Sequence, residues 1–382
     1  MWNPEAHATR ANGVSALLSL AGAFRDVGFT EAETVRALSA EDAADLLSNA
    51  AFYAFCSAGQ VAELVTTPAG VMVQLFVRNG DVARDRYERV VPAPTRELLA
   101  TLGLVSSDGD TVTSEVSVSP GRSMYFLSDQ LFRSDARVAI ANRSTLVMPP
   151  HASSFALLDN LGAVSGKLVD VGCGCGVLSL VLRERCSSVV GVDLNPRAVA
   201  YSRVNAVVNG VEAGFGLADL RGDLDVGRLA DHLVFNSPTG PGHHEEAEIG
   251  WMTAQDALGL VVDTMPGVLR PEGAAEVLLI VEVPEDRSSA TELVRSWLPP
   301  GTRADVVELR DSPLAASPQA VAGGRLAPGC LLADDAQEAV RLIDHLRANR
   351  IREVVPALVT LTRTRPFPSG REPSSRTTAA RS

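Results

Sequence analysis

The chain has few cysteines, few aromatic residues and a shortage of positive charge, and it contains no long apolar run. Its 34 Lys and Arg face 46 Asp and Glu, which gives a formal net charge of −12. Extended binding to nucleic acid depends on cations that neutralise phosphates, so this balance argues against a DNA partner. Because no apolar stretch approaches the roughly 18–20 residues that span a bilayer, we expect no membrane segment.

The five cysteines are an odd number without the spacing of a disulfide framework, which favours a reducing compartment. The N-terminus shows no basic start followed by an apolar stretch, so no secretory signal is expected. We therefore expect a cytoplasmic protein. At 382 residues the chain has room for two domains, one of them with a complete α/β core.

Composition and periodicity divide the chain into three regions. Residues 1–145 mix helical patterns with short strand patterns, and we interpret them as a substrate-binding or lid domain. Residues 146–365 alternate strands and helices. Residues 366–382 are rich in Pro, Ser, Arg and Thr without apolar periodicity, which predicts a disordered tail.

The N-terminal region is predicted to be an α+β domain. A helix is expected over residues 40–57 with Ser39 as its N-cap, and a strand over 71–77 before an Asn-Gly turn. A helix over 95–102 precedes a short β-hairpin, which is typical of a winged-helix module. Residues 1–150 hold 17 acidic residues against 12 Arg, whereas a DNA-reading wing is normally basic.

The second region predicts a doubly wound, mostly parallel α/β sheet. Apolar strands alternate with helical segments of about 10–15 residues, an arrangement that indicates a parallel sheet covered on both faces. Seven strands are expected. Six of them are residues 167–171, 189–193, 232–236, 276–283, 304–309 and 355–362, and the third strand in chain order ends near residue 217. Helices are expected at residues 178–185, 197–209, 253–269, 288–297 and 336–348.

A glycine-rich loop, Asp170-Val171-Gly172-Cys173-Gly174-Cys175-Gly176, follows the first of these strands and opens a helix. Ligands bind at this place in a doubly wound sheet, and glycines let the ligand touch the main chain. Dinucleotide enzymes use similar loops. Asp170 distinguishes this loop from those of dinucleotide enzymes, since its carboxylate suits the ammonium of a methionine moiety and would repel a pyrophosphate.

Two further acidic residues stand at the ends of the next strands. Asp193, followed by Leu194, ends the second strand, where a carboxylate can accept both hydroxyl hydrogens of a ribose. Asp219 and Leu220 follow the third strand, where Asp219 could accept from an adenine amino group and Leu220 could pack on its ring. Ribose recognition alone fits S-adenosylmethionine or NAD equally well.

At these residues the chain resembles class I S-adenosylmethionine-dependent methyltransferases, and most closely the "small domain" branch with HemK-like and RsmC-like enzymes. The likeness covers about residues 148–361, and residues 125–129 and 148–150 resemble the approach segment of relatives that carry a winged-helix-like N-terminus. The resemblance implies S-adenosylmethionine as cofactor. It implies a cofactor site made of Asp170, Gly172, Cys173, Gly174, Gly176, Asp193, Leu194, Asp219, Leu220 and Asn236.

The substrate motif departs from that family. Where the family has Asn-Pro-Pro-Tyr or Asn-Pro-Pro-Phe, this chain has Asn236-Ser237-Pro238-Thr239. The missing aromatic removes a stacking surface worth roughly 1–3 kcal/mol per base. We therefore expect N-methylation of a small molecule, in specialised metabolism, in preference to RNA or protein. Asn236 would accept the N–H of the acceptor and align its nitrogen with the methyl group.

Beside Asn236, Pro238 and Thr239, His243 completes the expected catalytic set. His243 and His244 follow the motif, and a histidine titrates near neutral pH, so either one could take a proton from the acceptor. A solvated loop is the alternative for both. No His-x-x-x-His or Cys-x-x-Cys spacing supports a metal site, so none is expected.

Three other functions stay open at this stage. The first is methylation of ribosomal RNA or a protein glutamine, as in the family that the chain resembles. The second is a winged-helix protein that binds DNA and only senses the cofactor. The third is an NAD-dependent dehydrogenase, which Asp170 disfavours.

Overall fold

The structure is a computed structural model of the full chain. It describes residues 2–8, 11–48, 53, 58–131, 145–222, 224, 229–240, 252–324 and 336–363. The predicted tail at 366–382 lies outside the described residues.

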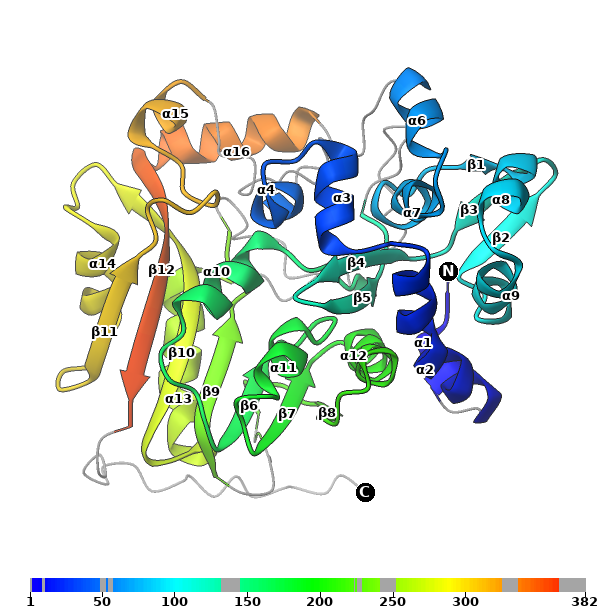
Figure 1. Ribbon diagram of the computed structural model, residues 1–382. Helices are drawn as coiled ribbons and strands as arrows, with labels where there is room; N and C mark the ends of the chain where they lie inside the picture. The colour runs from blue at the N-terminus through cyan, green and yellow to red at the C-terminus, as the bar shows by residue number, and fades with distance from the viewer. Residues whose placement is uncertain are drawn as a thin grey trace, which may run out of the picture.

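A seven-stranded sheet forms the centre of the second region (Figure 1). Its order is β8-β7-β6-β9-β10-β12-β11, and β12 runs antiparallel to both of its neighbours. The predicted doubly wound, mostly parallel α/β sheet is thus confirmed. Its strands are β6 (Lys167–Val171), β7 (Ser188–Asp193), β8 (Gly214–Leu217), β9 (Ala230–Asn236), β10 (Leu269–Pro284), β11 (Arg303–Glu308) and β12 (Ile351–Thr362).

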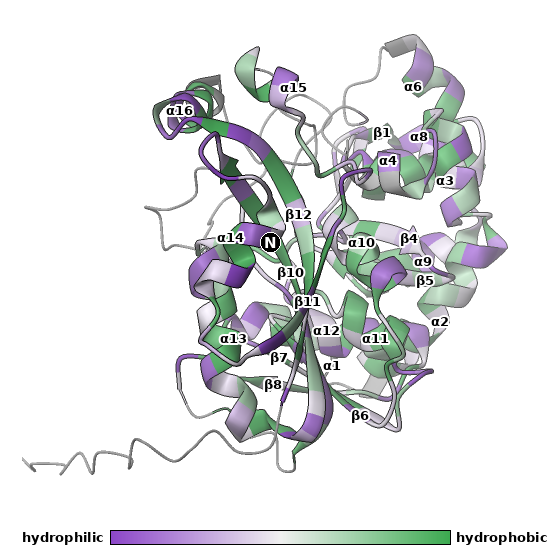
Figure 2. Cartoon of the chain, turned by 90° about the vertical axis from the view of Figure 1, so that its left-hand side faces the viewer, coloured by the Kyte–Doolittle hydropathy of each residue, from purple (hydrophilic) through white to green (hydrophobic). Residues whose placement is uncertain are grey.

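Helices cover both faces of this sheet. The two faces carry separate hydrophobic clusters because side chains alternate along each strand. Leu168 and Leu278 belong to the cluster that includes α11 and α12, whereas Val169 and Val277 belong to the cluster with α13 and α14. β10 and β12 are largely apolar in Figure 2. The helices are α10 (Ala152–Asn160), α11 (Val177–Leu182), α12 (Pro196–Asn209), α13 (Ala254–Val268), α14 (Ala290–Trp297), α15 (Pro318–Ala322) and α16 (Ala336–Ala348).

The N-terminal region combines short helices with two small antiparallel sheets. β1 (Val82–Ala83), β2 (Val105–Asp108) and β3 (Thr111–Ser114) form one sheet in the order β1-β3-β2. β4 (Ser117–Gly121) and β5 (Met124–Ser128) form the other. The helices are α1 (Pro4–Ala8), α2 (Ala11–Asp26), α3 (Glu31–Leu38), α4 (Ala43–Ser48), α6 (Ala58–Leu64), α7 (Pro68–Met72), η1 (Val73–Val77), α8 (Arg84–Val90) and α9 (Ala93–Thr101).

The expected helix followed by a hairpin is present as α9, β2 and β3. The winged-helix assignment stays a prediction.

Two local predictions in this region are wrong. The strand expected at residues 71–77 is helical, as the end of α7 and the π-helix η1. Residues 71–76 are all buried, so this helix shows no polar face, and a short apolar run cannot be assigned by periodicity alone. Ser39 starts no helix: it adopts φ 54° and ends α3, which Thr30 caps at its start.

The N-terminal region is joined to the α/β region along a line where β5 meets α12. Asn205 and Asn209 of α12 donate to the carbonyls of Leu127 and Tyr125, and they accept from the backbone N–H groups of the same two residues. The two asparagines thus give β5 the hydrogen bonds of a neighbouring strand. One buried cluster runs from the N-terminal helices through this junction to α11 and α12.

None of the helices in the described ranges is long and apolar enough to cross a membrane.

Candidate functional site

A cavity of about 480 Å³ lies at the carboxyl ends of the central strands. This is the edge at which open α/β sheets bind ligands. Its wall also includes residues 145–151, which lead into α10. The structure gathers nearly all of the predicted site residues here: Asp170, Gly172, Cys173, Gly174, Asp193, Leu194, Asp219, Leu220, Asn236, Pro238 and Thr239.

Of the predicted site residues that the structure describes, Gly176 does not line the cavity. Gly176 adopts φ 88° and forms the N-cap of α11, where an added Cβ would meet the Ser202 hydroxyl at 3.1 Å. A glycine is therefore required at position 176 by the turn and by helix packing. His243 lies outside the described residues, as does its neighbour His244.

The glycine-rich loop leaves main chain open toward the cavity. Gly174 has φ 56°, and a Cβ built on it would meet no heavy atom within 4 Å. A ligand can therefore approach this backbone closely. Cys173 and Cys175 are buried, and burial raises the pKa of both thiols, so neither is a thiolate near neutral pH.

Asp170 is buried with one oxygen unsatisfied. Its Oδ2 accepts from the backbone N–H of Ser179 at 2.9 Å and from the Ser179 hydroxyl at 2.6 Å, whereas Oδ1 has no partner among the described residues. Burial raises the pKa of Asp170 to about 7, against the Ser179 hydrogen bonds, which lower it. A buried orphan oxygen in a cavity wall fits a cationic ligand group, which would both pair with it and favour its ionised form.

Asp193 organises the loop as well as facing the cavity. It accepts from the backbone N–H of Gly174 at 2.9 Å and from that of Asn195 at 2.8 Å. Burial raises its pKa, while the backbone hydrogen bonds act in the opposite direction. A carboxylate has about four lone-pair sites, so capacity remains for the two hydroxyls of a ribose.

The outer end of the cavity is more exposed. Leu194 keeps 55% of its surface accessible, and Asp219 is exposed, with Oδ1 accepting from the backbone N–H of Arg221 at 2.9 Å. Leu220 is half-buried in the wall. An exposed leucine beside a cavity is available to pack on a flat ligand ring.

Asn236 is the last residue of β9, and β9 lies on the opposite side of β6 from β7, the strand that ends in Asp193 (Figure 1). Its Nδ2 donates to the hydroxyls of Ser153 at 3.0 Å and Ser154 at 3.2 Å, both in the first turn of α10. None of the described residues donates to its Oδ1. The oxygen is therefore free to accept from a ligand.

The neighbouring hydroxyls in the motif are bonded to β10. Ser237 donates to the carbonyl of Leu278 at 2.5 Å, and Thr239 accepts from the backbone N–H of Ile280 at 2.9 Å. The two side chains also contact each other at 3.1 Å. These bonds hold the turn after β9 against β10, so polar residues here have a structural reason. The catalytic role of Thr239 and Pro238 stays a prediction.

Residues His151, Ser153 and Ser154 were missed by the sequence reasoning. His151 caps α10 by accepting from the backbone N–H of Ser153 through Nδ1, at 3.4 Å. Burial lowers the pKa of His151 to about 4, so the imidazole is neutral at pH 7. The signal available was their position directly after the approach segment at 148–150.

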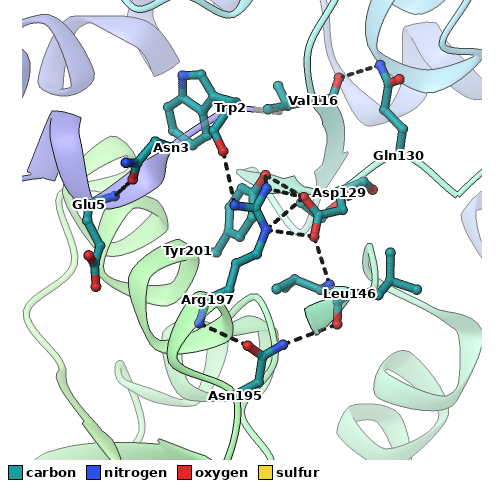
Figure 3. Close-up of polar contacts among 12 residues, drawn as sticks. Trp2, Asn3, Glu5, Val116, Asp129, Gln130, Leu146, Asn195, Arg197 and Tyr201 are labelled. Atoms are coloured by element: carbon teal, nitrogen blue, oxygen red, sulfur yellow. Dashed lines mark hydrogen bonds and ion pairs between the residues drawn. The ribbon is translucent and has the colours of Figure 1, made fainter. Parts of the chain in front are cut away.

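A buried ion pair fixes the wall at residues 145–150 (Figure 3). Arg197, in the first turn of α12, donates to Asp129, and Asp129 accepts in turn from the backbone N–H of Val147 at 2.9 Å. Tyr201 also donates to Asp129, and Arg197 reaches the carbonyl of Trp2. The cavity wall is thus tied both to the helix that follows Asp193 and to the N-terminal segment.

Comparison with known proteins places this chain among methyltransferases. The family model described as "Methyltransferase small domain" matches residues 151–265. A candidate protein N5-glutamine methyltransferase of Methanocaldococcus jannaschii is 30% identical over 142 residues, which are 35% of this chain and 71% of that protein. The ribosomal protein L11 methyltransferase of Laribacter hongkongensis is 43% identical over 75 residues, 19% of this chain and 24% of that protein.

A solved geranyl diphosphate methyltransferase in complex with S-adenosylmethionine is 17% identical, with a TM-score of 0.37. The match covers 56% of this chain and 85% of that one.

The comparisons correct one expectation. The Methanocaldococcus jannaschii and Laribacter hongkongensis relatives are named as enzymes that methylate proteins, so the preference for a small-molecule acceptor over a protein is wrong. That preference came from the lack of an aromatic residue at the position of Thr239. This feature does not distinguish a small-molecule acceptor from a protein acceptor. The chain spans only about a quarter of the length of the L11 methyltransferase that it matches.

Proposed function

The chain belongs to the class I S-adenosylmethionine-dependent methyltransferases, and on that premise we propose that it methylates a nitrogen of a protein side chain. The cofactor of this family is S-adenosylmethionine, which supplies an electrophilic methyl group when bound. The proposal depends on one observation: Asp170, Asp193 and Asn236 open into the same cavity of about 480 Å³.

We call the part of the cavity formed by Asp170, Gly174, Asp193 and Leu194 the cofactor half. Asp170 would hold the ammonium group through its unsatisfied Oδ1, and Asp193 would accept from the ribose hydroxyls. Leu194 and Leu220 line the same cavity and would offer apolar surface to the adenine, and Asp219 would accept from its amino group.

We call the part formed by Asn236, Pro238, Thr239 and the first turn of α10 the acceptor half. Asn236 would accept an N–H of the incoming nitrogen through Oδ1 and so leave the nitrogen lone pair free for in-line attack. Methyl transfer from a sulfonium needs mainly this alignment, with the reacting atoms about 3 Å apart. The proton that the acceptor nitrogen releases would go to His243, a prediction that concerns a residue outside those described.

A protein acceptor is supported by the relatives and by the charge of the chain. The matched relatives are named as protein methyltransferases, and the net charge of −12 disfavours extended contact with RNA phosphates. A protein glutamine, one of the acceptors considered from the sequence, presents a nitrogen with hydrogens that Asn236 could accept.

The test uses an extract from cells that lack this gene, purified enzyme and S-adenosylmethionine tritiated in the methyl group. We expect label that protease releases and ribonuclease does not. Label removed by ribonuclease would assign the activity to RNA instead. Calorimetry with S-adenosylhomocysteine and with NAD, in parallel, tests the cofactor half independently of the acceptor.

A further inference from the structure

The side-chain amide of Asn236 must point one way for the acceptor half to work. The proposed role requires Oδ1 toward the acceptor, because a flipped amide would present a donor to another donor. The terminal torsion of an asparagine is broad and roughly two-fold, so both orientations of the amide are accessible and the side chain alone does not fix one of them. Something around it has to set the direction.

Two serines of α10 take the amide hydrogens. The Nδ2 atom lies 3.0 Å from the Ser153 hydroxyl and 3.2 Å from the Ser154 hydroxyl. A serine hydroxyl can donate as well as accept, so these contacts alone would also allow the flipped amide. The direction is decided only if the hydroxyl hydrogen of a serine is used elsewhere.

His151 uses that hydrogen. Its Nδ1 accepts from the backbone N–H of Ser153 at 3.4 Å, as the N-cap of α10. Nδ1 therefore has no proton, and in its 3.2 Å contact with the Ser153 hydroxyl the hydroxyl must be the donor. The Ser153 oxygen is then left as an acceptor, and it faces Nδ2 of Asn236.

We propose that His151 and Ser153 are positioning residues that fix the polarity of the Asn236 amide, so that the site selects an acceptor bearing an N–H. The hydrogen bonds run in one direction, from the acceptor N–H to Oδ1, from Nδ2 to Ser153, and from Ser153 to Nδ1 of His151. This inference rests on the proposed function, and it adds two residues to it.

The polarity restricts the chemistry of the acceptor. A primary carboxamide or amine supplies both a hydrogen for Oδ1 and a nitrogen to be methylated. A carboxylate, or a ring nitrogen without hydrogen, would place lone pairs against Oδ1 and be rejected, because a buried polar group would lose its partner.

Three variants test this series of hydrogen bonds, which we call the relay, with the protein extract as acceptor and methyl-labelled S-adenosylmethionine as donor. Ser153→Ala removes the link, and we expect turnover to fall about tenfold while the Kd for S-adenosylhomocysteine stays within about twofold. Ser153→Thr keeps the hydroxyl and should restore most of the turnover. Ser154→Ala removes one acceptor but leaves the link to His151, so its loss should be smaller, about threefold. Equal turnover in Ser153→Ala and wild type, or an unrescued Ser153→Thr, would overturn the proposal.

A second measurement needs no acceptor. Nitrogen-15 NMR of the wild-type protein at pH 7 should show His151 as the neutral tautomer with hydrogen on Nε2 and none on Nδ1. A protonated Nδ1 would reverse the direction of the relay and refute it. If wild-type enzyme labels no protein while His151 shows the expected tautomer, the proposed function fails and the polarity of the relay stands.

Discussion

The two halves of the cavity are built from different kinds of contact. In the cofactor half, carboxylates bond to backbone N–H groups, as Asp193 does with Gly174 and Asn195, so the strand-to-helix turns themselves fix the geometry. In the acceptor half, the orientation of Asn236 depends on bonds to the side chains of two serines from another element. A site made by local backbone can be recognised in sequence, whereas one made by distant side chains cannot.

The strongest test of the cofactor half is Asp193→Ala. The variant removes the proposed ribose contacts and frees two backbone N–H groups that order the loop, so we expect the Kd for S-adenosylhomocysteine to rise roughly 100-fold. Isothermal calorimetry measures it. Asp193→Asn, which keeps one acceptor oxygen, should give an intermediate loss. A Kd within threefold of wild type would remove Asp193 from the cofactor half.

Asn236→Ala is the corresponding test of the acceptor half. Turnover should fall by roughly 10- to 100-fold, because misalignment of the reacting nitrogen by about 1 Å costs that much. Affinity for S-adenosylhomocysteine should stay within about twofold, since Asn236 ends β9 whereas Asp193 ends β7, on the other side of β6. Full turnover with the protein acceptor and methyl-labelled S-adenosylmethionine would show that Asn236 does not align the acceptor nitrogen.

The ionisation of Asp170 makes cofactor binding depend on pH. Burial raises its pKa to about 7, so the carboxyl is neutral in slightly acidic solution and charged above neutrality. Affinity for S-adenosylhomocysteine should therefore rise by roughly tenfold between pH 5.5 and 7.5, with release of a proton on binding at the lower pH. Asp170→Asn should bind weakly at all pH values in this range, and an unchanged slope in that variant would contradict the assignment.

The same shift has a consequence for the ligand-free protein. Between the ordinary pKa of an aspartate and about 7, the folded state holds a proton that the unfolded state has lost. Asp170 alone therefore makes the free energy of unfolding decrease as the pH rises through this range. Denaturant unfolding of wild type and Asp170→Asn at pH 5 and 7.5 isolates this contribution.

The smallest effect is expected for Thr239→Val. The threonine hydroxyl accepts from the backbone N–H of Ile280, so the near-isosteric valine should lower the free energy of unfolding by about 1 kcal/mol. Turnover should change less than about twofold if the hydroxyl serves only the turn after β9. A loss of turnover that exceeds the loss in stability would give Thr239 the catalytic role predicted from the sequence.

The sequence predicted the central sheet because its signals are local. The strand predicted at residues 167–171 and the helix predicted at 197–209 follow directly from residue order and periodicity. The strand predicted at residues 71–77 failed because a helix buried all round has no periodicity to detect. In the site, Asp170 and Asp193 were recognisable from the loop that they flank. Ser153 and Ser154 were not, since their position after the approach segment at 148–150 does not by itself indicate that α10 starts beside the end of β9.

The junction between β5 and α12 limits how this enzyme could be divided or recombined. Asn205 and Asn209 complete the hydrogen bonding of β5 from inside the methyltransferase fold. A fragment that begins at residue 146 would lack β5, leave the two asparagines without these hydrogen bonds and expose the apolar side of α12, and an exposed apolar patch promotes aggregation. Exchanging the N-terminal region with that of another methyltransferase would succeed only if the incoming strand met the same two asparagines.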